Sequence, residues 1–84
     1  MEFIEILFNY RGALIEAEIR PEEDCKGMLY PIHLNGGYSF TISYNEDEEE
    51  WSIMRESDGT IPAVEDELFK IISKQLKWEL MHAV

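Results

Sequence analysis

Few side chains in this sequence are of the types that perform chemistry, and their spacing argues against a reactive site. Cys25, the only cysteine, follows the acidic residues 22–24, which disfavour the thiolate that a nucleophilic cysteine needs. His33 and His82 are far apart, and neither has another histidine or a cysteine at zinc-ligand spacing. We therefore expect no catalytic residue, no metal and no cofactor, and a protein that is not an enzyme.

The acidic run 45–50 is the segment closest to a metal-binding motif. Its residues Asn45, Asp47 and Glu49 place oxygen ligands at alternate positions, as a calcium-binding loop does. An EF-hand would need a glycine where this chain has Glu50, and it would need flanking helices. We interpret the run as a solvated hairpin tip, with weak cation binding as the alternative left open.

A second group of carboxylates depends on how the first strands pair. Residues 4–19 alternate apolar with other side chains around Arg11-Gly12, a pattern typical of a β-hairpin. The register that pairs apolar residues with one another also places Glu5 opposite Glu18, with Glu16 nearby on the outer face. Two close carboxylates can cleave glycosides, but a chain with 18 acidic residues brings carboxylates together by chance. We interpret them as a solvated face, with contact to a basic partner as the alternative.

The same outer face is predicted to carry apolar side chains among its charges. Alternation leaves these residues outside the core: Phe3, Leu7, Leu14, Leu29 and Met54. Single exposed apolar residues are common, whereas a contiguous patch marks an association surface. We predict a partner-contact surface made of Phe3, Leu7, Leu14, Glu5, Glu16 and Glu18.

Residues 28–44 predict a second hairpin around Asn35-Gly36-Gly37. A three-residue loop with Gly37 in the left-handed region would pair Leu34 with Tyr38 and place Tyr38 on the inner face. Pro31 cannot donate to a ladder, so its strand is predicted to have an unpaired stretch or to lie at an edge.

Two further segments complete the predicted sheet. Residues 21–27 indicate a polar connection between the hairpins, and residues 51–55 predict a fifth strand that places Trp51 opposite Tyr44.

A change of period marks a helix from Pro62 to about His82. Its predicted apolar stripe consists of Val64, Leu68, Ile71, Ile72 and Leu76. We expect Phe8 and Ile71 to be buried on facing layers. Trp78 and Met81 lie at one margin of the stripe, where we expect them to close over a sheet edge rather than to mark a ligand site.

The whole chain, residues 1–84, fits one α+β domain. We predict a five-stranded antiparallel sheet, made of two hairpins and one strand, with one C-terminal helix packed on one face. A helix about 10 Å wide does not cover five strands about 4.8 Å apart, so we also expect uncovered sheet surface.

Charge narrows the classes of partner. The formal net charge is −11, and the chain lacks the stripe of lysines and arginines that binds nucleic acids and anionic membranes. We therefore expect neither as a partner. A single cysteine and an N-terminus without a secretory signal favour a cytoplasmic protein. We predict a non-enzymatic protein-interaction module that self-associates as a homodimer or binds a basic protein. The alternative is a small acidic inhibitor or immunity-type protein that neutralises a basic partner.

Several runs resemble a group of known proteins: residues 8–12, 15–19 and 38–42, and Ile61-Pro62 ahead of the helix. They are similar to small single-domain bacterial proteins with a β-hairpin meander and a C-terminal helix. The resemblance implies that fold, and it implies no activity and no site residues.

Overall fold

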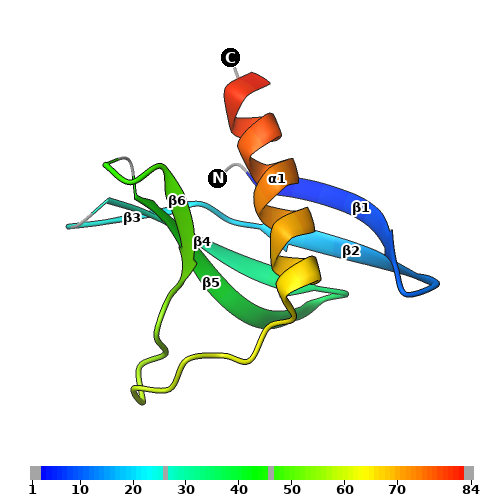
Figure 1. Cartoon of the computed structure of the whole chain (residues 1–84), viewed down its shortest axis with the longest axis horizontal. Helices are drawn as coiled ribbons and strands as arrows, with labels where there is room; N and C mark the ends of the chain where they lie inside the picture. The colour runs from blue at the N-terminus through cyan, green and yellow to red at the C-terminus, as the bar shows by residue number, and fades with distance from the viewer. Residues whose placement is uncertain (1–2, 26, 46, 83–84) are drawn as a thin grey trace.

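Six antiparallel strands and one helix make up residues 3–25, 27–45 and 47–82, which this computed structural model describes. The elements are β1 (Ile4–Tyr10), β2 (Ala13–Ile19), β3 (Glu22–Asp24), β4 (Gly27–Leu34), β5 (Gly37–Asn45), β6 (Glu50–Ile53) and α1 (Asp66–His82). The strand order is β1-β2-β4-β5-β6, with β3 beside β4 (Figure 1). The predicted α+β fold is confirmed.

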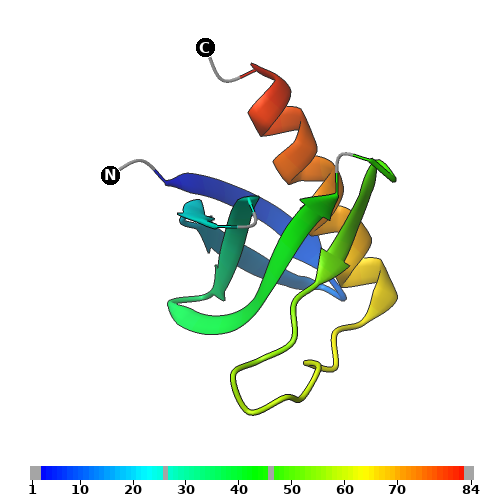
Figure 2. The same cartoon turned by 90° about the vertical axis from the view of Figure 1, so that its left-hand side faces the viewer.

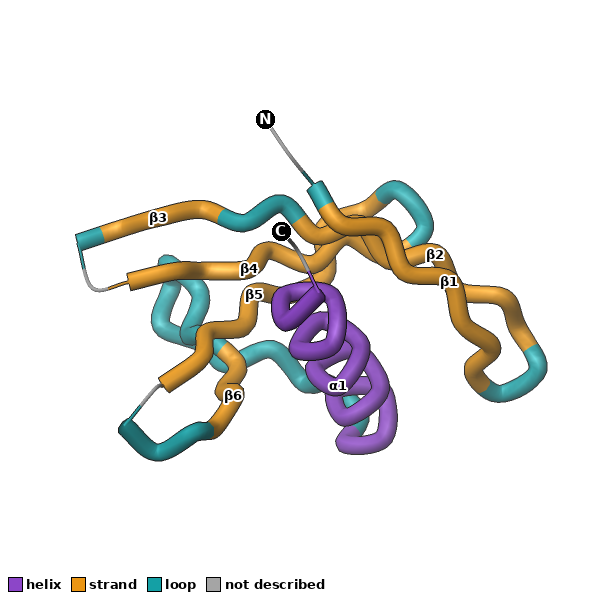
Figure 3. The backbone as a smooth tube through the Cα atoms, turned by 90° about the horizontal axis from the view of Figure 1, so that it is seen from above, coloured by secondary structure: helices purple, strands orange, loops and turns teal. Residues whose placement is uncertain are grey.

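The sheet curls around the helix. Figure 3 shows the strands as an arc with α1 in its hollow, and Figure 2 shows the strands on one side and the helix on the other. The core fills the concave side and consists of Ile6, Ala17, Ile19, Tyr30, Ile32, Phe40, Ile42, Ile72 and Leu76. The expectation that one helix is too narrow for the sheet assumed flat strands. A twisted and curved sheet brings its strands to the helix instead.

The first hairpin has the predicted register. The paired residues are Ile4 with Ile19, Ile6 with Ala17, Phe8 with Ile15 and Tyr10 with Ala13. Arg11 (φ 52°) and Gly12 (φ 80°) form a two-residue turn in which both residues are left-handed. Arg11 is unusual at such a position, but it forms an ion pair with Glu65 and lies 5.4 Å from the centre of the Tyr10 ring.

A short strand that the sequence did not predict, β3, continues the line of β2. Residues 22–24 were expected to be a connection, and instead they pair with residues 27–29 of β4. The break between β2 and β3 lies opposite Pro31. The backbone N–H of Arg20 donates to the Pro31 carbonyl at 3.4 Å, and Pro31 has no N–H to return the bond. Pro31 therefore sits in a central strand with an unpaired stretch, and the edge-strand alternative is wrong.

The tip of the second hairpin differs from the prediction. Its loop has two residues, Asn35 (φ 49°) and Gly36 (φ 88°), so Leu34 pairs with Gly37. Gly37 is not left-handed. The shorter loop is compensated by a β-bulge at Ser39, after which the pairing returns to the predicted register.

The bulge changes the face on which one aromatic residue lies. Tyr38 pairs with His33 on the outer side of the sheet, whereas Phe40 keeps its predicted partner Ile32 in the core. Beyond the bulge, Tyr44 pairs with Trp51 as predicted.

The helix begins at Asp66, four residues after the predicted start at Pro62. The carbonyl of Glu65 accepts the first helical hydrogen bond, from the Phe69 N–H at 3.0 Å, which makes Glu65 the N-terminal capping residue. Pro62 belongs instead to an extended connection. None of the described helices has the length and apolar character needed to cross a bilayer.

The buried face of α1 is rotated from the predicted stripe. Ile72 and Leu76 are fully buried, and Leu68 and Phe69 pack against the core beside them. Phe8 and Ile71 are each only half-buried, so the expectation that both are buried is wrong. Neighbouring helical residues point about 100° apart, so Ile71 and Ile72 cannot both occupy the centre of one face.

Candidate protein-binding surface

Five of the six residues predicted to contact a partner lie on the outer, convex side of β1 and β2, and the sixth, Phe3, is exposed just before β1. This surface, called here the outer hairpin surface, consists of Phe3, Glu5, Leu7, Leu14, Glu16 and Glu18. The fold brings them together because successive strand residues alternate between faces and the first hairpin has the predicted register. Whether a partner binds there stays a prediction.

The apolar members of this surface are strongly exposed. Leu7 is 63% exposed, Leu14 65% and Phe3 50%. Leu7 faces Glu16 and Leu14 faces Asn9, so the two leucines are diagonal neighbours on adjacent strands. Both leucines therefore lie on the outer face with polar residues as their direct cross-strand partners.

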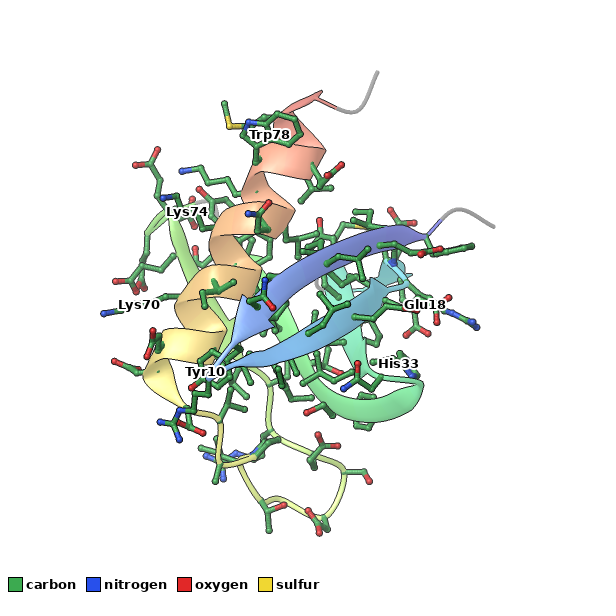
Figure 4. The ribbon with its side chains drawn as sticks, turned by 90° about the vertical axis from the view of Figure 1, so that its right-hand side faces the viewer. Tyr10, Glu18, His33, Lys70, Lys74 and Trp78 are labelled. Atoms are coloured by element: carbon green, nitrogen blue, oxygen red, sulfur yellow. The ribbon has the colours of Figure 1, made fainter. Side chains whose placement is uncertain are left out.

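Two of the charged members, Glu5 and Glu18, belong to a row of paired residues that crosses four strands. Glu5 pairs with Glu18, Glu18 with His33, and His33 with Tyr38. Figure 4 labels Glu18 and His33 near one another on the outer side of the sheet. An Nη2 atom of Arg20 lies 3.3 Å from Glu18 Oε1 and partly neutralises it.

Two of the three glutamates keep their charge available. Among the described residues, neither Glu5 nor Glu16 has an ion-pair partner. Like charges on paired strands weaken a ladder. A cationic group placed beside them would relieve that repulsion.

Tyr38 ends the row in a polar cluster. Its ring packs edge-on against His33, with centroids 5.6 Å apart, and its hydroxyl donates to Glu56 Oε1 at 2.9 Å. The Thr41 hydroxyl oxygen lies 2.8 Å from the Tyr38 hydroxyl oxygen. Burial raises the pKa of Tyr38, and the Glu56 carboxylate adds to this rise, whereas the bond with Thr41 opposes it. The row lies on a convex face, which does not enclose a substrate as a binding pocket does.

One edge of β1 is free. β1 stands at the end of the strand order, and β2 is its only partner among the described strands. Tyr10 and Ala13 close a two-residue turn and form a hydrogen-bonded pair. In an antiparallel ladder such pairs alternate with pairs that exchange no hydrogen bonds. Glu5, Leu7 and Asn9 belong to the second kind, so their N–H and C=O groups point away from β2. In Figure 1, no other segment lies above β1 to the right of the helix.

This edge lacks the devices that usually protect an edge strand. Its seven residues, Ile4–Tyr10, include no proline and no lysine, and its ladder with β2 runs without a bulge. Glu5 is its only charged residue. The residues that carry the exposed side chains of β1 are also those that present free backbone groups.

The hairpin that carries the surface is tied to the rest of the fold at its tip and in the middle of β2. At its tip, the Tyr10 hydroxyl donates to Glu65 Oε2 at 2.9 Å beside the Arg11–Glu65 ion pair. Burial raises the pKa of Tyr10, and the Glu65 acceptor raises it further. Farther along β2, Glu16 N–H donates to Asn35 Oδ1 at 2.9 Å and its carbonyl accepts the Asn35 N–H at 2.8 Å. Sequence patterns did not predict this clamp, because Asn35 was explained by its turn.

The remaining residues considered for chemistry do not converge. Cys25 is exposed, His33 faces outward as predicted, and the His82 side chain lies outside the described residues. At the acidic tip, Asn45 Oδ1 accepts the N–H groups of Asp47 (2.9 Å) and Glu48 (3.2 Å). Glu46 lies outside the described residues. Among those described, no three His, Cys, Asp or Glu side chains are grouped so that they could hold a metal.

Comparison with protein-family models, with curated proteins and with solved structures finds no match for this chain. The resemblance to small bacterial proteins therefore stays a prediction. The functional proposal depends on the geometry of the outer hairpin surface and on the free edge of β1.

Proposed function

We propose that this protein is a non-enzymatic protein-binding module that takes an extended, basic segment of a partner along the free edge of β1. One observation carries this proposal. Glu5 and Leu7 combine free backbone N–H and C=O groups with exposed side chains on the outer hairpin surface. A partner strand would meet hydrogen-bonding groups and side-chain contacts at the same residues.

The mode of binding is addition of a strand to the sheet. In this mode, main-chain hydrogen bonds supply affinity and alternate side chains supply specificity. Every second residue of the bound segment would lie on the convex side. A basic side chain there would lie beside Glu5, and an apolar one would pack on Leu7, since β2 is one strand farther away.

Charge favours a basic partner over a second copy of this chain. Two copies would bring together chains of net charge −11 and place Glu5 of each near the carboxylates of the other. A basic segment would gain attraction from the same groups, and the field of the whole protein would accelerate its approach. Self-association along the same edge would require salt to screen the repulsion.

A labelled peptide of alternating lysine and valine is a suitable probe, with a glutamate–valine peptide of equal length as its control. We expect fluorescence anisotropy to show binding of the lysine peptide, weakening as salt is raised, and no binding of the control. The Leu7→Pro variant removes an N–H that points away from β2, so it blocks strand addition and leaves the β1–β2 ladder intact. It should lower affinity by about tenfold or more, a loss of about 1.4 kcal/mol.

Matched variants separate strand addition from general attraction. Leu7→Thr keeps the N–H and should bind more tightly than Leu7→Pro. Glu5→Lys should weaken binding more than Glu67→Lys, which changes an exposed charge on the helix. Equal binding by Leu7→Pro and the wild type would refute strand addition. Dimerisation that strengthens with salt in sedimentation equilibrium, without peptide binding, would favour self-association instead.

A further inference from the structure

A pocket of about 240 Å³ opens between the C-terminal half of α1 and strands β4 to β6, away from the outer hairpin surface. Its walls are Tyr30, Tyr44, Trp51, Lys77, Leu80 and Met81. Strands β4, β5 and β6 each contribute one aromatic ring, and the helix contributes two apolar side chains and one lysine. The proposal below concerns this pocket and does not depend on the function proposed for β1.

Aromatic rings form the sheet side of the pocket. The Trp51 ring lies edge-on to Tyr30, with centroids 5.4 Å apart, and tilted against Tyr44 at 5.0 Å. The indole nitrogen Nε1 of Trp51 is buried and has no hydrogen-bond partner among the described residues. Because this nitrogen is shielded from solvent, Trp51 contributes its ring rather than its N–H group to the pocket wall.

The helix side of the pocket is positively charged. Lys77 is the only charged residue among the walls, in a chain with 18 acidic side chains. An adjoining hollow is lined by Lys74, Gln75, Lys77, Trp78 and Met81, again with lysines as its only charges. These lysines share one side of α1 because they are three residues apart. In Figure 4, Lys74 lies on the side of the helix away from β1 and β2.

Two helix residues beside the pocket are exposed, Trp78 by 55% and Met81 by 71%. The expectation that they close over a sheet edge stays a prediction. The mouth of the pocket therefore stays accessible along the helix.

We propose that this pocket binds a small aromatic carboxylate. Its ring would lie against Trp51 and the apolar helix residues Leu80 and Met81, and its carboxylate would accept from the Lys77 ammonium. An apolar cavity of about 150 Å³ holds benzene, so the larger pocket has room for a bicyclic ring.

The net charge of the protein predicts the opposite preference, which makes the proposal sharply testable. A net charge of −11 favours a cation over an anion of the same shape at any unspecialised surface. Only the local lysine would reverse this order. A comparison of isosteric ligands of different charge therefore distinguishes a built site from a merely apolar patch.

Three probes of one shape serve this comparison: 2-naphthoate, 2-naphthamide and 2-naphthylmethylammonium. Binding to the full chain is followed by the indole N–H signals in ¹H–¹⁵N spectra, with Trp78→Phe used to assign the signal of Trp51. We expect naphthoate to bind with a Kd on the order of 1 mM or tighter and to shift the Trp51 signal. It should bind about fivefold more tightly than the amide, and the ammonium most weakly.

Variants of two helix lysines complete the test. Lys77→Gln should lower the affinity for naphthoate to that for naphthamide and leave the amide unchanged. Lys70→Gln is the matched control, since Lys70 lies on the same helix and lines neither hollow, and it should change neither affinity. Equal affinities for the three probes in the wild type, tightest binding of the ammonium, or an unmoved Trp51 signal would each overturn the proposal.

Discussion

Shortening Ile72 and Ile71, one at a time, measures how α1 packs against the sheet. Ile72 is fully buried in the core, whereas its neighbour Ile71 is half-buried and lies outside the core cluster. Ile72→Ala should lower the free energy of unfolding by about 2–5 kcal/mol, through lost apolar burial and the cavity left behind. Ile71→Ala should cost roughly 1 kcal/mol or less, because part of its side chain already contacts water and alanine has the higher helix propensity.

Urea denaturation followed by circular dichroism gives both values. With a slope of about 1 kcal/mol/M for a small domain, the midpoint should fall by about 2 M or more for Ile72→Ala and by about 1 M or less for Ile71→Ala. A domain of 84 residues has only about 4–13 kcal/mol of stability, so Ile72→Ala can leave a marginal fold. In that case the milder variants Ile72→Val and Ile71→Val are compared instead, and Ile72→Val is expected to cost about 0.5–1.5 kcal/mol.

The reasoning fails if the two positions respond alike. Equal losses at Ile71 and Ile72, or a larger loss at Ile71, would mean that the helix presents the stripe predicted from sequence. The orientation of the pocket-forming residues on α1 would then be wrong as well.

Three further outcomes are expected. Gly36→Ala should cost about 1 kcal/mol or more in urea denaturation because Gly36 has φ 88°, whereas Gly37→Ala should cost less because Gly37 is not left-handed. Glu56→Gln should lower the raised pKa of Tyr38 toward 10.0 in an ultraviolet titration; no change would argue against that hydrogen bond. Because folding raises the pKa of Tyr38, its contribution to stability is present below its ordinary pKa and is lost as pH rises through its pKa in the folded state. Carbon-detected titration should show Asp58 with a pKa below 3.8, because a neighbouring threonine hydroxyl donates to it. The stabilisation by Asp58 should be present above its ordinary pKa and lost as pH falls through its pKa in the folded state. A pKa at or above 3.8 would contradict the hydrogen bond from the threonine hydroxyl.

The residues of the outer hairpin surface could be predicted from sequence because strand alternation is a local property. Residues 4–19 carry two apolar runs of period two around a short turn, and a slip of one residue would expose every core side chain of the hairpin. Register and face therefore followed from the sequence, and Leu7, Leu14 and the three glutamates lie where they were expected. The helix was also predictable as an element, because its apolar period differs from that of the strands.

The first residue of the helix and the face that it buries were not predictable from sequence. Pro62 is compatible with the first turn of a helix and with an extended connection, and the choice depends on where Glu65 meets Tyr10 and Arg11 across the fold. Ile71 and Ile72 both fit the apolar period, and only packing against the curved sheet selects Ile72.

Sequence by itself determined the pairing of the first hairpin and of the second away from its tip, the α+β class and the faces on which most side chains lie, since these depend on residues close together in the chain. Tertiary structure decided the strand order that leaves β1 at a free edge and the bulge that moves Tyr38 outward. It also decided the meeting of Trp51 with Lys77. The bulge lies within one hairpin, and it brings the Tyr38 hydroxyl to Glu56. The strand order and the pocket join segments far apart in the chain, and their geometry is set by how the twisted sheet closes around α1, which no local pattern encodes.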